Sequence, residues 1–236
     1  MLMPRQVATR TEGLSGGGQA NSPEGLMLRY ARGRVRYFAG RQLVTALGVA
    51  VLWMTQPPQA AVLALCLALA GEAVDCLFLR RVPALLRRGV PLRRIDMIST
   101  ATGGFQALTI TGCVFIAWTA YDGHAEPLLG MGFLTSAALN AALMAPFHKN
   151  AAVARLVIYG LAPVLLYAKE LVHGFHIEPV YLQNMAGSAM LIATTAMFLR
   201  FAVQNFDRTR RHTELQERHQ DELERTNQRL REKREQ

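Results

Sequence analysis

Long apolar runs separated by short polar segments fill the middle of the chain, between residues 37 and 203. A soluble protein of this length would place its apolar residues in short periodic segments. Several runs here reach about 20 residues, the length that a helix needs to cross roughly 30 Å of bilayer hydrocarbon. The pattern predicts an all-α fold, a polytopic membrane bundle of six transmembrane helices. The expected spans are residues 37–55, 59–79, 98–120, 127–146, 152–172 and 179–203.

Polar segments flank the apolar region at both ends. Residues 1–36 contain the stretch GLSGGGQANSPEG and begin without an apolar core, which predicts a disordered, basic N-terminus and excludes a cleaved secretory signal. Residues 204–236 contain no Gly or Pro and consist mostly of strong helix formers. We therefore expect a disordered N-terminus (1–36), a six-helix membrane domain (37–203) and a charged C-terminal helix (204–236).

Basic residues alternate between the two sides of the expected membrane. The turn between the second and third spans carries Arg80, Arg81, Arg87, Arg88, Arg93 and Arg94. The segments between spans one and two, three and four, and five and six carry no Lys or Arg. Because cytoplasmic loops hold the excess of Lys and Arg, this alternation places the arginine-rich turn and both termini in the cytoplasm.

The first span has the weakest apolar pattern, because Arg41 and Gln42 lie near its start and its strictly apolar part is short. We expect Arg41 to extend its guanidinium to the lipid headgroups. The alternative is an interfacial helix, which would move the N-terminus and leave the other five spans in place.

Composition narrows the function classes. The net charge is +9, but no basic face with interleaved aromatic residues is present, so no nucleic-acid partner is expected. The lipid bilayer is the expected partner instead. Cys66, Cys76 and Cys113 lie in apolar runs without CxxC spacing and predict neither a disulfide nor a metal site. No phosphate loop, HExxH, GxSxG or kinase signature is present, and no cofactor is expected.

Glu72 and Asp75, in GEAVDCLFLRR, are the most informative charges within an expected span. Three residues apart on a helix, they share one face. A carboxylate within the membrane is costly, which marks both as candidate functional residues. Two interpretations stay open. They couple protons or contact a ligand, or they pair with Arg80, Arg81 or Arg155 and fix the orientation of the helix.

Gln106 and Asn140 are the amide side chains closest to the middle of the expected membrane. They are candidates to line a polar pocket for a small amphipathic ligand, or to form hydrogen bonds between helices. The fourth span also carries Ala137, Ala141 and Ala145 at four-residue spacing. This stripe of small residues indicates close helix packing, either within the bundle or across a dimer.

Histidines gather in two loops on the expected outer side. His124 lies in one loop, and His173 and His176 lie in another, each beside carboxylates. Imidazoles and carboxylates bind metal ions and titrate near neutral pH. These three residues are therefore candidates for a metal or pH-sensing site if the loops converge.

Three leucines of the C-terminal segment, Leu215, Leu223 and Leu230, lie on one weak heptad-like seam. The seam contains one extra four-residue step, which locally unwinds a left-handed coil. It predicts a coiled-coil-like signalling helix that pairs in a homodimer, and the alternative is a solvated charged helix.

A six-span module with GEAVD before an Arg-rich turn, followed by a helix rich in Arg, Glu and Gln, resembles the membrane-embedded N-terminal input region of bacterial sensor histidine kinases, often hybrid ones. In that family the last span feeds a dimeric phosphoacceptor domain and an ATP-binding domain, and a similar layout precedes cyclase domains. The resemblance implies the bacterial inner membrane and a downstream kinase or cyclase domain. Neither His212 nor His219 is followed by the family's acidic-Arg-Thr-Pro run, so no catalytic residue carries over.

These patterns together predict a sensor module that relays a stimulus through the last span into a cytoplasmic coiled coil, as in two-component systems. The chain itself carries no catalytic motif, and the resemblance implies at most the regulatory part of a kinase. The alternatives are a small secondary transporter or channel using Glu72 and Asp75, and a membrane scaffold whose tail binds a partner's coil.

Overall fold

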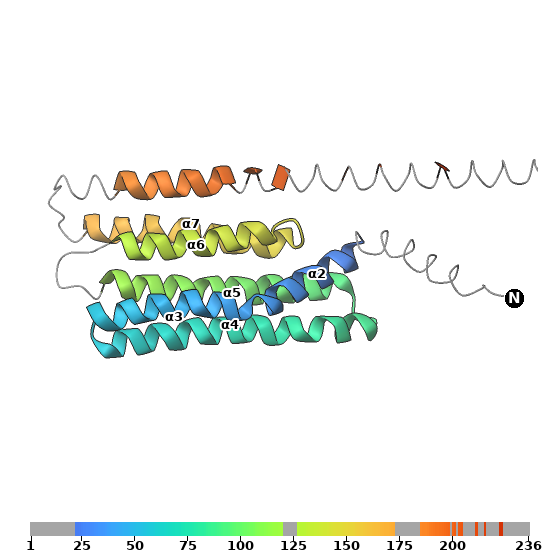
Figure 1. Ribbon diagram of the computed structural model, residues 1–236, viewed down its shortest axis with the longest axis horizontal. Coiled ribbons are helices and arrows are strands. Elements are labelled where there is room, and N and C mark those ends of the chain that lie inside the picture. Colours follow the sequence, from blue (N-terminus) through green and yellow to red (C-terminus); the bar gives the residue numbers. More distant parts are fainter. Residues whose placement is uncertain are drawn as a thin grey trace, which may run out of the picture.

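The computed structural model describes residues 22–119, 127–172 and 185–198, with single positions between 200 and 223. In chain order its helices are α2 (Pro23–Arg36), α3 (Phe38–Thr55), α4 (Pro58–Arg87), α5 (Leu92–Thr119), α6 (Pro127–Met144) and α7 (Lys149–Val172). A further apolar helix, Met185–Phe198, follows them and is called the last helix below. The helices form an elongated bundle in which α2 runs obliquely across one end (Figure 1). The all-α prediction is confirmed for the described residues.

Four helices among the described residues are long and apolar enough to cross a membrane: Phe38–Thr55, Pro58–Arg87, Leu92–Trp118 and Lys149–Lys169. The fourth and sixth expected spans coincide with shorter apolar helices, Leu129–Met144 and Met185–Phe198. Large apolar side chains such as Leu47, Trp53 and Leu165 are exposed on the bundle surface, as expected for a surface that faces lipid. The membrane-bundle prediction therefore holds for four helices, and the number of six spans stays a prediction.

The helix ends follow from the local sequence. Gln56 caps α3 in extended conformation, and Pro58 begins α4 at a position where a missing N–H is tolerated. Between α4 and α5 the chain reverses at Gly89, whose φ of +74° suits glycine. Both helices are longer than the expected spans, so the arginine-rich turn shrinks to residues 88–91 and most of its arginines lie on helices.

The predicted disorder of residues 1–36 is wrong for Pro23–Arg36, which forms α2. The Ser22 side chain accepts a hydrogen bond from the Gly25 amide at 3.1 Å, and Pro23 and Glu24 follow in the first turn. A serine cap, an early proline and an acidic first turn are all typical of a helix start. The buried face of α2 consists of Met27, Tyr30, Ala31 and Arg34.

Helix α5 lies at the centre of the bundle and packs against α4, α6 and α7, whereas α2 and α3 pack mainly on α4. At Gly71 the backbones of α4 and α5 approach so closely that an added Cβ would collide with the Thr109 hydroxyl and lie 3.1 Å from the Cα of Gln106. This close contact sets the polar face of α4 directly against α5. An apolar core fills most of the bundle, and a smaller core including Met27, Tyr30 and Leu79 lies beneath α2.

Candidate functional site

Asp75 of α4 is fully buried and accepts hydrogen bonds from three helices. Its Oδ2 lies 2.9 Å from Nη2 of Arg34 on α2 and 2.8 Å from Nη2 of Arg155 on α7. Its Oδ1 accepts a hydrogen bond of 3.0 Å from the Thr102 hydroxyl on α5. Both oxygens are thus engaged, which is what a buried carboxylate requires.

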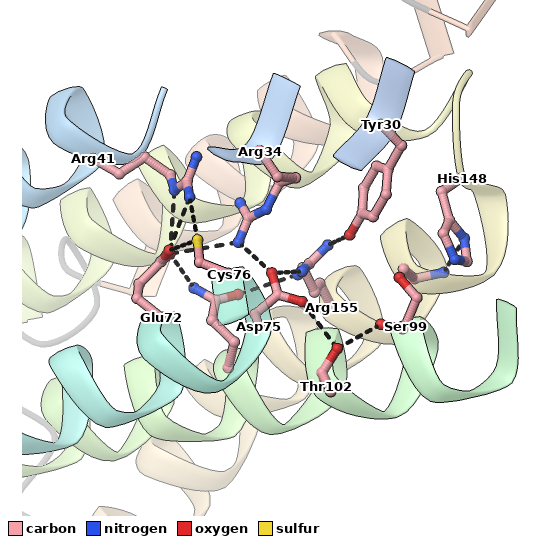
Figure 2. Close-up of polar contacts among 12 residues, drawn as sticks. Tyr30, Arg34, Arg41, Glu72, Asp75, Cys76, Ser99, Thr102, His148 and Arg155 are labelled. Carbon is pink, nitrogen blue, oxygen red and sulfur yellow. Dashed lines mark hydrogen bonds and ion pairs between the residues drawn. The ribbon is translucent and has the colours of Figure 1, made fainter. Parts of the chain in front are cut away.

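Glu72 lies one turn earlier on the same face of α4 and is 3% exposed. Arg41 of α3 contacts it with two nitrogens, Nη2 at 2.9 Å and Nε at 3.2 Å. Gln106 Nε2 donates to Glu72 Oε1 at 3.0 Å, and Arg34 Nη2 lies 3.5 Å from the same oxygen. Arg34 therefore stands between the two carboxylates, as Figure 2 shows.

Arg155 joins α7 to three other helices although it is only 1% exposed. Besides Asp75, it donates from Nε to Gln106 Oε1 at 3.1 Å and from Nη1 to the Tyr30 hydroxyl at 2.7 Å. A Cβ at Gly103 of α5 would lie 2.9 Å from the Arg155 guanidinium. A larger residue than glycine at position 103 would therefore displace this side chain.

We call Arg34, Arg41, Glu72, Asp75 and Arg155 the ion cluster. The interpretation that the two carboxylates pair with arginines is confirmed for Asp75 and Arg155. Arg80 and Arg81, which were also expected to pair with the carboxylates, are exposed. Arg34 and Arg41 form ion pairs with the carboxylates in their place. The expectation that Arg41 extends to the lipid headgroups is wrong, because Glu72 holds its guanidinium inside the bundle.

Arg34 and Tyr30 are the site residues that the sequence reasoning missed. Both lie in the segment expected to be disordered. The sequence pattern that indicates their burial is the helical spacing of positions 27, 30, 31 and 34, which follows the N-cap residue Ser22. Burial by itself lowers the pKa of Arg34, but the charges of Glu72 and Asp75 more than reverse this and raise it above its ordinary value. Arg34 therefore stays charged in the protein interior.

A cavity of about 70 Å³ adjoins the ion cluster and is called the polar cavity. Three of the four residues predicted for ligand contact, Glu72, Gln106 and Asn140, line it. Asp75 does not line the cavity but contacts Arg34 and Arg155, which do. Helices α3 and α6 complete the wall with residues that include Thr45, Phe133, Ser136 and Ala137. The structure thus joins these candidates into one site, with Gln106 also forming the interhelical hydrogen bonds that were the alternative.

A second, apolar cavity of about 180 Å³ lies between α6, α7 and the last helix. Leu134, Ala138 and Pro163 line it from one side, and Ile192 and Thr195 of the last helix line it from the other. Tyr159 of α7 lines both cavities. This buried side chain therefore borders both the polar cavity and the cavity beneath the last helix.

Most of the remaining predicted residues lie outside the part of the chain that the structure describes. His124, His173, His176 and Leu230 lie outside the described residues, so the metal or pH-sensing prediction stays a prediction. Within the described part of the chain, no group of three or more His, Cys, Asp or Glu side chains is arranged to hold a metal ion. Leu215 and Leu223 are helical and exposed, and the coiled coil stays a prediction.

Comparison with protein-family models, curated proteins and solved structures finds no match to this chain.

Proposed function

We propose that this chain is a membrane-embedded signal-input module of a bacterial inner membrane. It has six spans and cytoplasmic termini, and it relays a stimulus from the ion cluster through the last helix into a cytoplasmic coiled coil. The coil pairs two copies of the chain and drives a downstream kinase or cyclase domain. The observation that carries the proposal is the position of Tyr159 between the polar cavity and the cavity beneath the last helix.

The relay works through this shared wall. A close-packed interior resists small movements, but a cavity lets a side chain change position without compressing its neighbours. A change in the ion cluster shifts Tyr159 into or out of the 180 Å³ cavity, and the last helix adjusts to the change in the shape of its seat. Small shifts of this kind are converted into two discrete helix arrangements in many signalling proteins.

Transport by Glu72 and Asp75 receives less support from the same geometry. All four carboxylate oxygens accept hydrogen bonds from arginine, glutamine or threonine side chains. A transport cycle would have to break several of these bonds in a buried site at every turnover, which is costly.

Disulfide crosslinking of the tail tests the relay in the full chain in native membranes. Leu223→Cys is introduced into a Cys66→Ser background, which removes the one exposed native thiol and leaves the buried Cys76 and Cys113 in place. Tyr159→Ala should change the rate of intermolecular crosslinking at position 223 by about fivefold, the lower end of typical couplings between sites. Tyr159→Phe keeps the ring and removes only the hydroxyl, which forms a hydrogen bond with Gln106, and should change the rate less than Tyr159→Ala does.

Equal crosslinking rates in all three proteins would contradict the relay, and no crosslinking at any tail position would contradict the paired coil. A solute flux into proteoliposomes that Glu72→Gln abolishes would instead identify a transporter.

A further inference from the structure

The ion cluster carries more positive than negative charge. Three arginines, Arg34, Arg41 and Arg155, face two carboxylates, Glu72 and Asp75, so one positive charge is left over. Asp96 of α5 interacts elsewhere: it accepts a hydrogen bond from Asn150 at 2.9 Å and lies 3.5 Å from His148. A buried charge is stable only with a counter-charge or strong hydrogen bonds. The cluster as built therefore calls for one more negative charge.

A buried donor in the same place has no acceptor. Arg34 is 3% exposed, and its Nε has no hydrogen-bond partner among the described residues. Its Nη2 is already used by Glu72 and Asp75. Because nearly all buried polar groups in folded proteins are paired, an unpartnered guanidinium N–H indicates an acceptor that the described residues do not supply.

The polar cavity offers room for that acceptor. Arg34, Arg41 and Arg155 all line it, and Ser136 and Asn140 add a hydroxyl and an amide group. Its volume is about 70 Å³, whereas a cavity needs only roughly 10–15 Å³ on the same measure to hold one water molecule. The polar cavity therefore has room for an ion of a few heavy atoms.

We propose that the polar cavity between α3 and α6 is a binding site for a small monoanion, such as chloride, nitrate or formate. The anion supplies the missing charge and accepts from the buried side of Arg34. It gives the proposed input module its ligand class and in that sense rests on the proposed function, although binding is measured without any output. A bound anion weakens the hydrogen bonds from Arg34 and Arg41 to Glu72, because the anion and the carboxylates then compete for the same guanidinium N–H donors.

Thermal unfolding of the full chain, purified in a neutral detergent without added lipid, measures binding through the fluorescence of Trp53 and Trp118. Sodium chloride, nitrate or formate replaces sodium gluconate at constant ionic strength. The expected result is a saturable rise in the unfolding temperature with the three small anions and none with gluconate, the bulkier reference anion. An equal response to gluconate would show a general salt effect and overturn the proposal.

Two neighbouring alanines of α6 provide a matched pair. Ala137 lines the polar cavity, and Ala138 lines the apolar cavity beneath the last helix. Ala137→Leu should fill the site and remove the anion-dependent rise, whereas Ala138→Leu should keep it. A rise that survives Ala137→Leu, or one that appears only when phosphatidylglycerol is added, would overturn the small-anion site.

The two proposals fail separately. Anion binding with unchanged tail crosslinking in Tyr159→Ala would leave the site standing and remove the relay. If Tyr159→Ala changes the crosslinking of the tail but the protein binds no anion, the relay stands and the anion site is refuted.

Discussion

Two helix contacts in this bundle are built in opposite ways. At the α4–α5 contact the backbones meet at Gly71, and the polar side chains around it bond to one another across the helices. The last helix instead lies over a cavity of about 180 Å³, and its polar link to α7 is a hydrogen bond of 2.6 Å between Tyr167 and Ser188. Close packing fixes one relative position of two helices, whereas a void permits more than one. We call the α4–α5 contact, with the ion cluster beside it, the frame. The contact of the last helix, by contrast, allows that helix more than one position.

The largest expected effect comes from breaking the frame at Asp75. Asp75→Ala leaves Arg34 and Arg155 buried without their shared counter-ion, and loss of one partner of a buried pair typically costs about 3–5 kcal/mol. The unfolding temperature in detergent should fall sharply. Ala138→Leu, at the other contact, is the control and should not lower it. A loss of stability no greater than that of an exposed substitution would mean that the ion cluster does not hold the helices together.

A smaller loss is expected from crowding the same contact. In Gly71→Ala the new methyl group overlaps the Thr109 hydroxyl, and overpacking of this kind costs about 1–3 kcal/mol. Gly160→Ala in α7 is the matched control, since a Cβ there has nothing within 4 Å. The control should gain up to about 1 kcal/mol from its higher helix propensity. Equal unfolding temperatures for the two variants would contradict the close α4–α5 approach.

The smallest effect concerns His148, between α6 and α7 at the α2 end of the frame. Burial lowers its pKa, Arg155 acts in the same direction, and Asp96 acts against them. Because the folded pKa lies below the unfolded value of about 6.5, the unfolded chain takes up the proton first. Burial of neutral His148 therefore costs no stability above about pH 6.5, and the folded state loses stability relative to the unfolded chain as the pH falls below that value. The unfolding temperature, measured from pH 8 to pH 5, should fall less steeply in His148→Gln than in the parent. An identical pH dependence would exclude His148 as the cause.

The fold follows from the sequence wherever the bilayer imposes a length. The apolar runs that predict α3, α4, α5 and α7 differ from the observed helices mainly at the ends, because charged residues such as Arg87 continue a helix beyond the hydrocarbon. Glu72 and Asp75 were identified because a charge inside an apolar run is costly wherever it lies.

The partners of these carboxylates were only partly predictable. Arg155 was among the expected candidates, but Arg34 follows a Gly- and Ser-rich stretch whose composition indicates disorder. Its role depends on α2 folding back onto α4, a contact between residues 41 positions apart. The two cavities depend on how side chains from separate helices fit together, so the periodic pattern of any one helix does not predict them.

The pairing of Asp75 with Arg155 also constrains how the protein is made. The two residues are 80 positions apart, which corresponds to roughly 4–16 s of translation at about 5–20 residues per second. During that interval the nascent α4 holds a carboxylate whose α7 partner has not yet left the ribosome. Arg34, synthesised earlier, is already present to neutralise it. Of the two arginines that contact Asp75, only Arg34 precedes it in the chain, so the contact with α2 is the one that can form first.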